Sequence, residues 1–320
     1  MKTVLLSAPY MLTDRERFVS LLQKLNFQVI TPELEERMEE RDLLEYAGSF
    51  DGTICGDDRY SAQVLEACSP RLRVISKWGT GIDSIDAEAC EELGILIGNT
   101  PNAFTLPVAD SVLGYILAFA RRQPWMDRAM KKGVWEKIPG HSLSETTLGV
   151  IGVGNVGKAV IRRADAFGMK LLGNDIRDVE PDFIAEHRVE MVDLGSLLSR
   201  SDYVSVNCDL NPTSRNLLGR EEFRAMKNTG VVINTARGPI IDQEELIEAL
   251  ETGKIAGAAL DVFEREPLPE DSPLLGMDQV LLAPHNANTS PKAWERVHRN
   301  TLRNLLIGLE RDPEELKEVV

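Results

Sequence analysis

The chain has 320 residues, of which 43% are hydrophobic and 27% charged, and its formal net charge is −15 at pH 7. This length exceeds what one hydrophobic core usually holds, so we expect two domains of ordinary globular composition. Because an acidic surface repels nucleic acid and anionic membranes, we expect neither as a partner. An anionic substrate would need positive charge placed locally at its site.

The cysteines and the apolar runs indicate in which cellular compartment the protein is expected. The four cysteines form no C-x-x-C pair and lie near no histidine with metal-ligand spacing, so we expect buried thiols and no metal. The apolar N-terminus runs straight into charged residues and predicts a first strand, not a signal peptide. The most apolar long run, 108–120, is too short to span a bilayer and contains Asp110. We therefore expect a cytoplasmic protein.

The first hundred residues alternate between strand and helix patterns. Short apolar runs predict strands at 3–7, 28–30, 52–55, 73–76 and 95–97. Helical patterns, such as 14–25 and 62–67, lie between them. This alternation predicts a parallel sheet with helices on both faces. After a break at 98–101, a long buried helix is predicted from Pro107 to Lys132.

A second alternating series begins at Thr147. It predicts strands at 148–153, 170–174, 203–207, 230–234, 256–261 and 279–283, followed by a last helix from 291 to about 309. The series indicates a second parallel sheet with helices on both faces.

The segment GVGNVG at 152–157 fits the pattern G-x-G-x-x-G, with a predicted strand before it and a helix after it. In that setting the glycines permit a tight turn, close approach to a pyrophosphate and close helix–strand packing. The helix N-terminus attracts the phosphate charge. Asp175, 18 residues after Gly157, favours NAD over NADP because a carboxylate binds ribose hydroxyls and repels a 2′-phosphate. Arg177 leaves NADP open, and a tight turn without cofactor is the alternative for the whole segment.

Three later predicted strands end in chemically active side chains, at the sheet edge where open α/β folds bind ligands. Arg237 follows the first, Asp261, Glu264 and Glu266 follow the second, and His285 follows the third. Each alone is more often a surface ion pair, a solvated loop or a packed histidine. Together they offer a cation for a carboxylate, an acid/base near neutral pH and a carboxylate to orient it. The set predicts hydride transfer between NAD and an acid that carries an alcohol carbon.

The order GVGNVG, NTARG, DVFEREP and PHNANTS resembles the D-2-hydroxyacid dehydrogenases, closest to the short form of D-3-phosphoglycerate dehydrogenase. The resemblance covers nearly the whole chain. It implies two Rossmann-like, doubly wound parallel-sheet α/β domains. An NAD-binding domain of residues 101–287 would be inserted in a discontinuous substrate-binding domain of residues 1–100 and 288–320. It also implies an active site in the cleft between domains, a hydroxy or keto acid substrate and a homodimer.

The resemblance also implies roles for individual residues. Arg237 would bind the substrate carboxylate and carbonyl, and His285, hydrogen-bonded by Glu266, would give and take the proton of the carbonyl oxygen. The implied cofactor contacts are Gly152, Gly154, Asn155, Val156, Gly157, Asp175, Cys208, Thr235, Ala236, Asp261 and His285. The implied substrate contacts are Lys77, Trp78, Gly79, Thr80, Gly81 and Arg237, with the backbone N–H groups of 79–81 facing the carboxylate.

Departures from the family pattern leave the substrate open. Lys77 stands where many phosphoglycerate dehydrogenases have an arginine, and the bulky Trp78 follows it. Asp57 and Asp58 lie where a second arginine is often found, and they would oppose a phosphate; Phe104 replaces an asparagine. The resemblance implies a function like that of D-3-phosphoglycerate dehydrogenase, and reduction of glyoxylate or hydroxypyruvate is the alternative. A non-catalytic protein that senses NAD is the alternative class.

Overall fold

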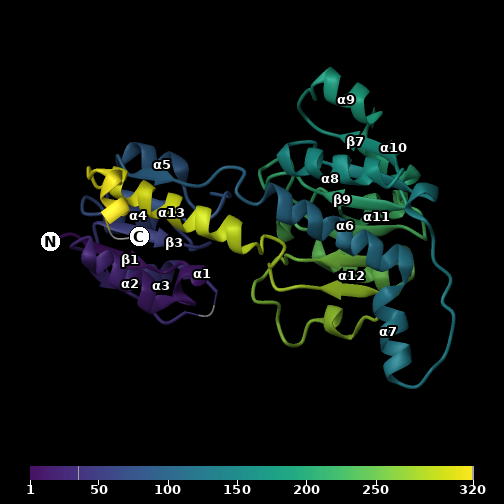
Figure 1. Cartoon of the computed structure of the whole chain (residues 1–320), viewed down its shortest axis with the longest axis horizontal. Helices are drawn as coiled ribbons and strands as arrows, with labels where there is room; N and C mark the ends of the chain where they lie inside the picture. Colours follow the sequence, from purple (N-terminus) through teal and green to yellow (C-terminus); the bar gives the residue numbers. More distant parts are fainter. Residues whose placement is uncertain (35, 319–320) are drawn as a thin grey trace. The chain divides into compact units, whose positions relative to one another are not determined.

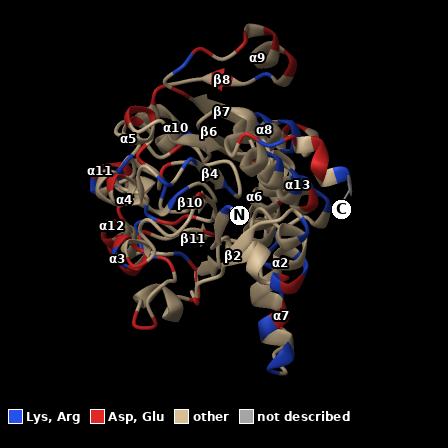
Figure 2. Ribbon diagram, turned by 90° about the vertical axis from the view of Figure 1, so that its left-hand side faces the viewer, with Lys and Arg blue, Asp and Glu red and all other residues tan. Residues whose placement is uncertain are grey.

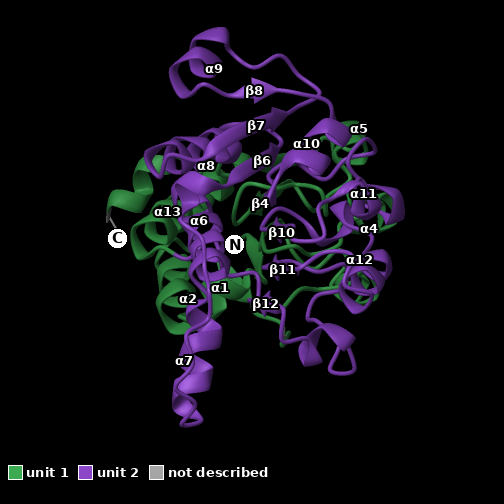
Figure 3. Cartoon of the chain, turned by 90° about the vertical axis from the view of Figure 1, so that its right-hand side faces the viewer, with its two compact units in different colours: residues 1–104, 290–320 green, residues 105–289 purple. Residues whose placement is uncertain are grey.

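The computed structural model describes residues 1–34 and 36–318. The chain forms two compact units (Figure 3): unit 1 is made of Met1–Phe104 and Ser290–Val320, and unit 2 of Thr105–Thr289. Each unit contains one parallel sheet covered by helices on both faces. The predicted fold class, two Rossmann-like α/β domains, is confirmed.

Unit 1 contains a five-stranded parallel sheet in the order β2-β1-β3-β4-β5. Its strands are β1 (Thr3–Leu6), β2 (Gln28–Ile30), β3 (Gly52–Cys55), β4 (Val74–Lys77) and β5 (Leu96–Gly98). Its helices are α1 (Pro9–Leu12), α2 (Arg15–Lys24), α3 (Glu40–Leu44), α4 (Ala62–Cys68), α5 (Ala87–Glu92) and α13 (Pro291–Gly308), with a 3-10 turn at Pro313–Glu318. Strands β1, β3 and β4 are continuously buried, as expected for a sheet covered on both faces.

Helix α13 packs with α2 on one face of this sheet, while α3, α4 and α5 pack on the other. Figure 1 shows yellow α13 among the purple and blue elements of unit 1. A Cβ on Gly308 would stand 2.3 Å from Val74 Cγ2, and Ser76 Oγ donates to Thr301 O over 2.7 Å. The close approach of α13 to β4 explains why the end of the chain belongs to unit 1.

Unit 2 contains a seven-stranded parallel sheet in the order β12-β11-β10-β9-β6-β7-β8. Its strands are β6 (Thr147–Ile151), β7 (Lys170–Asn174), β8 (Glu190–Met191), β9 (Tyr203–Val206), β10 (Val231–Asn234), β11 (Gly257–Leu260) and β12 (Val280–Leu282). Its helices are α6 (Thr105–Arg121), α7 (Gln123–Lys131), α8 (Asn155–Ala166), α9 (Pro181–His187), α10 (Leu194–Arg200), α11 (Arg220–Ala225) and α12 (Gln243–Glu251), with 3-10 turns at Leu143–Glu145, Gly238–Ile240 and Pro273–Gly276. The strand order reverses between β6 and β9, so the turn after β6 lies at the switch point where such sheets bind ligands.

The single long helix predicted from Pro107 to Lys132 is wrong. The structure has two helices, α6 and α7, because Arg122 adopts a left-handed conformation with φ of 55°. Pro124 stands in the first turn of α7, where its missing N–H costs no hydrogen bond but would break a continuous helix. Helix α6 buries one face, whereas α7 has no buried residue.

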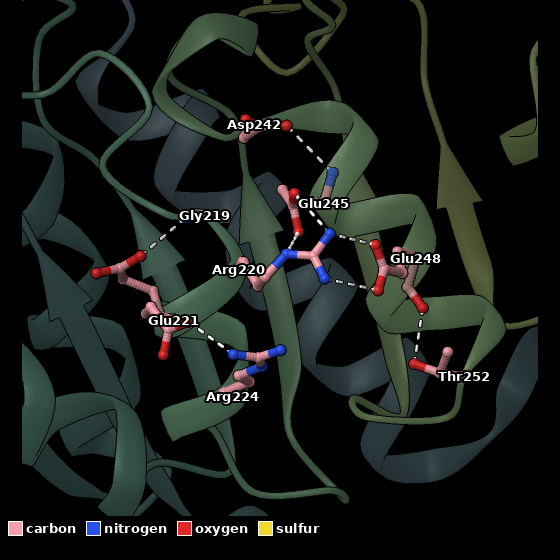
Figure 4. A network of polar contacts seen from close by, with 9 residues as sticks. Gly219, Arg220, Glu221, Arg224, Asp242, Glu245, Glu248 and Thr252 are labelled. Carbon is pink, nitrogen blue, oxygen red and sulfur yellow. Dashed lines mark hydrogen bonds and ion pairs between the residues drawn. The ribbon is translucent and has the colours of Figure 1, made fainter.

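Charged residues lie mainly on the helices and loops around the two sheets (Figure 2). In unit 2 they tie α11 to α12 (Figure 4): Arg220 contacts Glu245 at 2.9 Å and Glu248 at 2.7 Å. Asp242 caps α12 by accepting from the Glu245 N–H over 3.1 Å. Because these ion pairs are partly exposed, each contributes at most about 1 kcal/mol, and together they position two helices rather than drive folding.

Candidate active site

The turn from β6 into α8 is shaped by its glycines. Gly152 has a φ of +85°, and a Cβ there would stand 2.6 Å from the backbone nitrogen of Cys208. A Cβ on Gly157 would stand 2.0 Å from the carbonyl oxygen of Gly152, whereas a Cβ on Gly154 would meet nothing within 4 Å. The turn is therefore closed against its own unit and open where α8 begins at Asn155. This geometry fits a pyrophosphate bound at the helix N-terminus.

Asp175 stands at the end of β7, beside this turn. Its Oδ2 accepts a hydrogen bond from the Val153 N–H over 2.7 Å, and its Oδ1 accepts from the Arg177 N–H over 2.8 Å. The half-buried carboxylate is thus held next to the glycine turn, as a ribose-binding acid must be. The Arg177 side chain is exposed, so its part in nucleotide choice stays a prediction.

Cys208, Thr235 and Ala236 follow β9 and β10 at the same sheet edge and are all half-buried. Burial raises the pKa of the Cys208 thiol to about 11, so it stays protonated. Val156 lies in the first turn of α8. These positions agree with contacts to a bound nucleotide, which remain predictions for each residue.

His285 is held by the carboxylate of Glu266 and by the backbone carbonyl of Asp261, two residues of the segment that follows β11. Its Nδ1 lies 2.9 Å from Glu266 Oε2, and Glu266 Oε1 accepts from the Phe263 N–H over 2.9 Å. The His285 N–H donates to the Asp261 carbonyl over 2.8 Å, and the backbone has a φ of 50°, which is rare outside glycine. A carboxylate at Nδ1 orients the ring, so the proton exchange with a substrate that is predicted for His285 would use Nε2.

Asp261 anchors the loop that carries His285. Its carboxylate accepts from the N–H groups of Asn286 and Ala287 over 2.8 and 2.9 Å. The side chain is buried, and burial raises the pKa of the Asp261 carboxyl above its usual range. Sequence reasoning placed Asp261 near the cofactor but missed this anchoring, which no local pattern signals.

Arg237 reaches the same edge because of the glycine that follows it. A Cβ on Gly238 would stand 1.9 Å from the backbone carbonyl of Phe263, so only glycine lets the two loops meet. The loop is also held by Asn234, which accepts from the Ala236 N–H over 3.0 Å and donates to the Arg237 carbonyl over 2.9 Å. The structure therefore brings the Arg237 loop against the loop that carries Glu266.

In unit 1, the loop after β4 presents its backbone at the carboxyl edge of the sheet. Gly79 has a φ of +119°, and its carbonyl accepts from the Thr100 N–H over 2.7 Å. The Thr80 hydroxyl donates to the Thr100 carbonyl over 2.9 Å, and Asn99 Nδ2 donates to the Thr80 carbonyl over 2.6 Å. Thr80 is exposed and Gly81 half-buried. The carbonyls of the loop are thus occupied from within the unit, an arrangement that suits N–H donation to an anion.

Lys77 and Trp78 lie beneath this loop and are buried. Lys77 Nζ lies 3.1 Å from Asp57 Oδ1, so its charge is balanced by an acid. Trp78 Nε1 donates to His298 Nδ1 over 2.9 Å, and its ring stacks on Tyr10 with centroids 4.2 Å apart. Burial lowers the pKa of His298, which keeps it neutral and able to accept. The structure gives the Trp78 side chain a packing role.

Two general expectations concern metals and membranes. Among residues 1–34 and 36–318, no group of three or more His, Cys, Asp or Glu side chains could hold a metal ion. None of the helices in the described part of the chain is long and apolar enough to cross a membrane.

Comparison with known proteins gives the family. The family model for the NAD binding domain of D-isomer specific 2-hydroxyacid dehydrogenases matches residues 113–287. A glyoxylate reductase of Korarchaeum cryptofilum is 40% identical over 255 residues, which cover 78% of this chain and 76% of that protein. A D-3-phosphoglycerate dehydrogenase of Methanocaldococcus jannaschii is 39% identical over 265 residues, which cover 82% of this chain but 48% of that protein. The structure of D-lactate dehydrogenase from Aquifex aeolicus with NAD and lactic acid has a TM-score of 0.84 and 26% identity, covering 99% of this chain and 98% of that one. The chain therefore belongs to the D-isomer specific 2-hydroxyacid dehydrogenases and is an NAD-dependent oxidoreductase of that family.

Proposed function

We propose that the protein interconverts a short, unphosphorylated 2-keto acid and its 2-hydroxy acid, either glyoxylate and glycolate or hydroxypyruvate and D-glycerate. The observation that carries this proposal is the pairing of buried Lys77 with Asp57 at 3.1 Å. The pair cancels the positive charge at the edge of the substrate loop, where a phosphate dianion would need it. Relatives named glyoxylate reductase and hydroxypyruvate reductase support the same class.

The side chains have complementary tasks in this reaction. When bound, NAD(H) supplies and accepts the hydride. Arg237 binds the carboxylate and the carbonyl oxygen through its planar guanidinium. The backbone N–H groups of the loop 79–81 are the donors that unit 1 offers to a carboxylate. His285 donates a proton from Nε2 to the carbonyl oxygen during reduction and takes it back during oxidation. Glu266 holds the imidazole by its Nδ1 and stabilises the protonated ring.

D-3-phosphoglycerate is the second candidate substrate. It is favoured by the 39% identity to the Methanocaldococcus jannaschii enzyme, although this chain spans about half the length of that relative. Asp57 and Asp58 oppose it, because both carboxylates stand close to the buried Lys77.

Steady-state kinetics separate these candidates. We expect NADH-dependent reduction of glyoxylate and hydroxypyruvate with kcat/KM at least about tenfold above that for 3-phosphohydroxypyruvate. Faster turnover of the phosphorylated acid would overturn the substrate class. NAD binding without turnover of any acid would point to a sensor.

Two histidine variants test the proposed chemistry. His285→Asn should lower kcat by about 10²- to 10⁴-fold while NAD binding, measured by fluorescence titration, persists. His141→Asn, which changes an exposed histidine of the same unit, should leave kcat unchanged. Equal activity of the two variants would refute the role of His285.

We also propose a homodimer formed through unit 2. Helix α7, which projects beyond the sheet of its unit (Figure 1), has no buried residue, and Trp135 in the following segment is 83% exposed. Met130 and Val134 are also exposed, and apolar patches of this kind commonly mark interfaces. Light scattering should show a dimer that Trp135→Ala weakens; a monomeric wild-type protein would refute the proposal.

A further inference from the structure

We propose that Asp57 is a specificity-determining residue that accepts a hydrogen bond from a hydroxyl group on C3 of the substrate. This inference rests on the proposed function and names the substrate class more closely. The favoured substrate is hydroxypyruvate, a 2-keto acid with a hydrogen-bond donor on C3. We expect it to be preferred over pyruvate, in which C3 is a methyl group, and over 3-phosphohydroxypyruvate, in which the C3 hydroxyl is esterified.

The topology places Asp57 at the substrate edge of unit 1. Strands β3 and β4 are parallel neighbours, with Cys55 opposite Lys77 in the register. The Trp78 N–H continues the ladder by donating to the Cys55 carbonyl over 2.9 Å. Asp57 therefore follows β3 at the same edge at which the loop 79–81 follows β4.

Lys77 directs the Asp57 carboxylate towards that loop. Its Nζ lies 3.1 Å from Asp57 Oδ1, donates to the Trp78 carbonyl over 3.1 Å, and lies 3.7 Å from where a Cβ on Gly79 would stand. The Lys77 side chain is 4% exposed, whereas that of Asp57 is 31% exposed. The member of the pair that a ligand meets is thus the carboxylate.

The segment that carries Asp57 is held by hydrogen bonds to Ser7 and Met38. Asp58 is completely buried and accepts hydrogen bonds from the Ser7 hydroxyl and, over 2.8 Å, from the Met38 N–H. The Arg59 N–H donates to the Met38 carbonyl over 3.0 Å. Because the two residues that follow it are held in this way, the position of Asp57 is set before a substrate arrives.

Two side chains of different chemistry lie near Gly79. Lys77 Nζ and Phe104 Cε2 each lie 3.7 Å from the position of a Cβ on Gly79, and Lys77 is paired with Asp57. Phe104 packs on Trp78, with ring centroids 5.4 Å apart. The apolar Phe104 ring suits the carbon skeleton of a short acid, and the Asp57 carboxylate suits its polar substituent.

A carboxylate in this place discriminates among C3 substituents. It has about four lone-pair sites, so it can accept from a substrate hydroxyl while it is paired with a lysine. A methyl group would leave that acceptor without its partner, and a phosphate would be repelled. A site built for a hydroxyl therefore rejects both analogues.

Selectivity ratios test the inference. We expect wild-type kcat/KM with NADH to be at least about tenfold higher for hydroxypyruvate than for pyruvate or 3-phosphohydroxypyruvate. Asp57→Asn exchanges a charge-assisted hydrogen bond for a neutral one and should lower the ratio of hydroxypyruvate to pyruvate about tenfold. It should also raise kcat/KM for 3-phosphohydroxypyruvate, because the Lys77 charge is no longer cancelled. The double variant Asp57→Asn/Lys77→Met keeps the test informative if the single variant folds poorly.

Asp51→Asn is the matched control, because it removes a half-buried, ion-paired carboxylate from the opposite end of the same strand. It should leave the substrate ratios at wild-type values. If Asp57→Asn changes kcat/KM for all acids by the same factor, or if the wild-type enzyme does not prefer hydroxypyruvate to pyruvate, the inference is overturned while the proposed function stands. If the wild-type enzyme reduces none of these acids, the proposed function itself fails.

Discussion

Replacement of Asp58 by asparagine should stabilise the protein, and more so at higher pH. Asp58 is fully buried, and burial raises the pKa of its carboxyl from 3.8 to about 6, despite the hydrogen bonds from Ser7 and Met38. Asparagine has nearly the same shape, can accept from the Met38 N–H and can donate to the Ser7 hydroxyl. It keeps these contacts without a buried charge.

The sign and size follow from proton linkage. Because the folded state binds the Asp58 proton more tightly than the unfolded chain, wild-type stability falls as pH rises through the window from 3.8 to about 6. This pKa difference between the unfolded and folded states corresponds to about 3 kcal/mol of folding free energy in total, of which about half is lost between pH 5 and pH 8. Asp58→Asn lacks this loss. Its advantage in free energy of unfolding should therefore grow by about 1.5 kcal/mol from pH 5 to pH 8.

Urea unfolding followed by circular dichroism at pH 5, 6, 7 and 8 measures this difference. Asp51→Asn serves as the control, since Asp51 binds the Thr3 N–H and Arg71 at the other end of β3 and should show no such growth. An Asp58→Asn advantage that is constant with pH, or that shrinks as pH rises, would refute the reasoning from burial.

Three further variants test the NAD-binding unit. Glu266→Gln keeps the size of the side chain but removes the charge next to His285, so kcat should fall about 10- to 100-fold. Oxidation of the hydroxy acid should also persist to lower pH, and an unchanged pH profile would contradict this role of Glu266. Gly157→Ala should weaken NAD binding at least about tenfold in calorimetric titration, because the added Cβ collides with backbone, whereas Gly276→Ala, with open space around it, should bind NAD normally. Asp175→Ser should raise kcat/KM with NADPH relative to NADH, and an unchanged ratio would show that Asp175 does not select the nucleotide.

Local patterns in the sequence determined the fold class and the candidate chemistry. The alternation of short apolar runs with helical periods predicted parallel sheets, because strands buried on both faces must be continuously apolar. The spacing of the glycines at 152–157 predicted the turn between β6 and α8, because backbone conformation and close approach are encoded within a few residues. The residues at strand ends, such as Arg237 and His285, could be named because parallel strands present their carboxyl ends at one edge.

The contacts that arrange those residues were decided only by the tertiary structure. Nothing local shows that Gly238 packs on the Phe263 backbone, that Asp261 anchors the His285 loop, or that Lys77 pairs with Asp57. These contacts depend on register between strands and on packing between segments far apart in the chain, which side-chain type and spacing along the sequence do not encode. The break between α6 and α7 at Arg122 differs from them, because Pro124 in the first turn of α7 is a local signal for it.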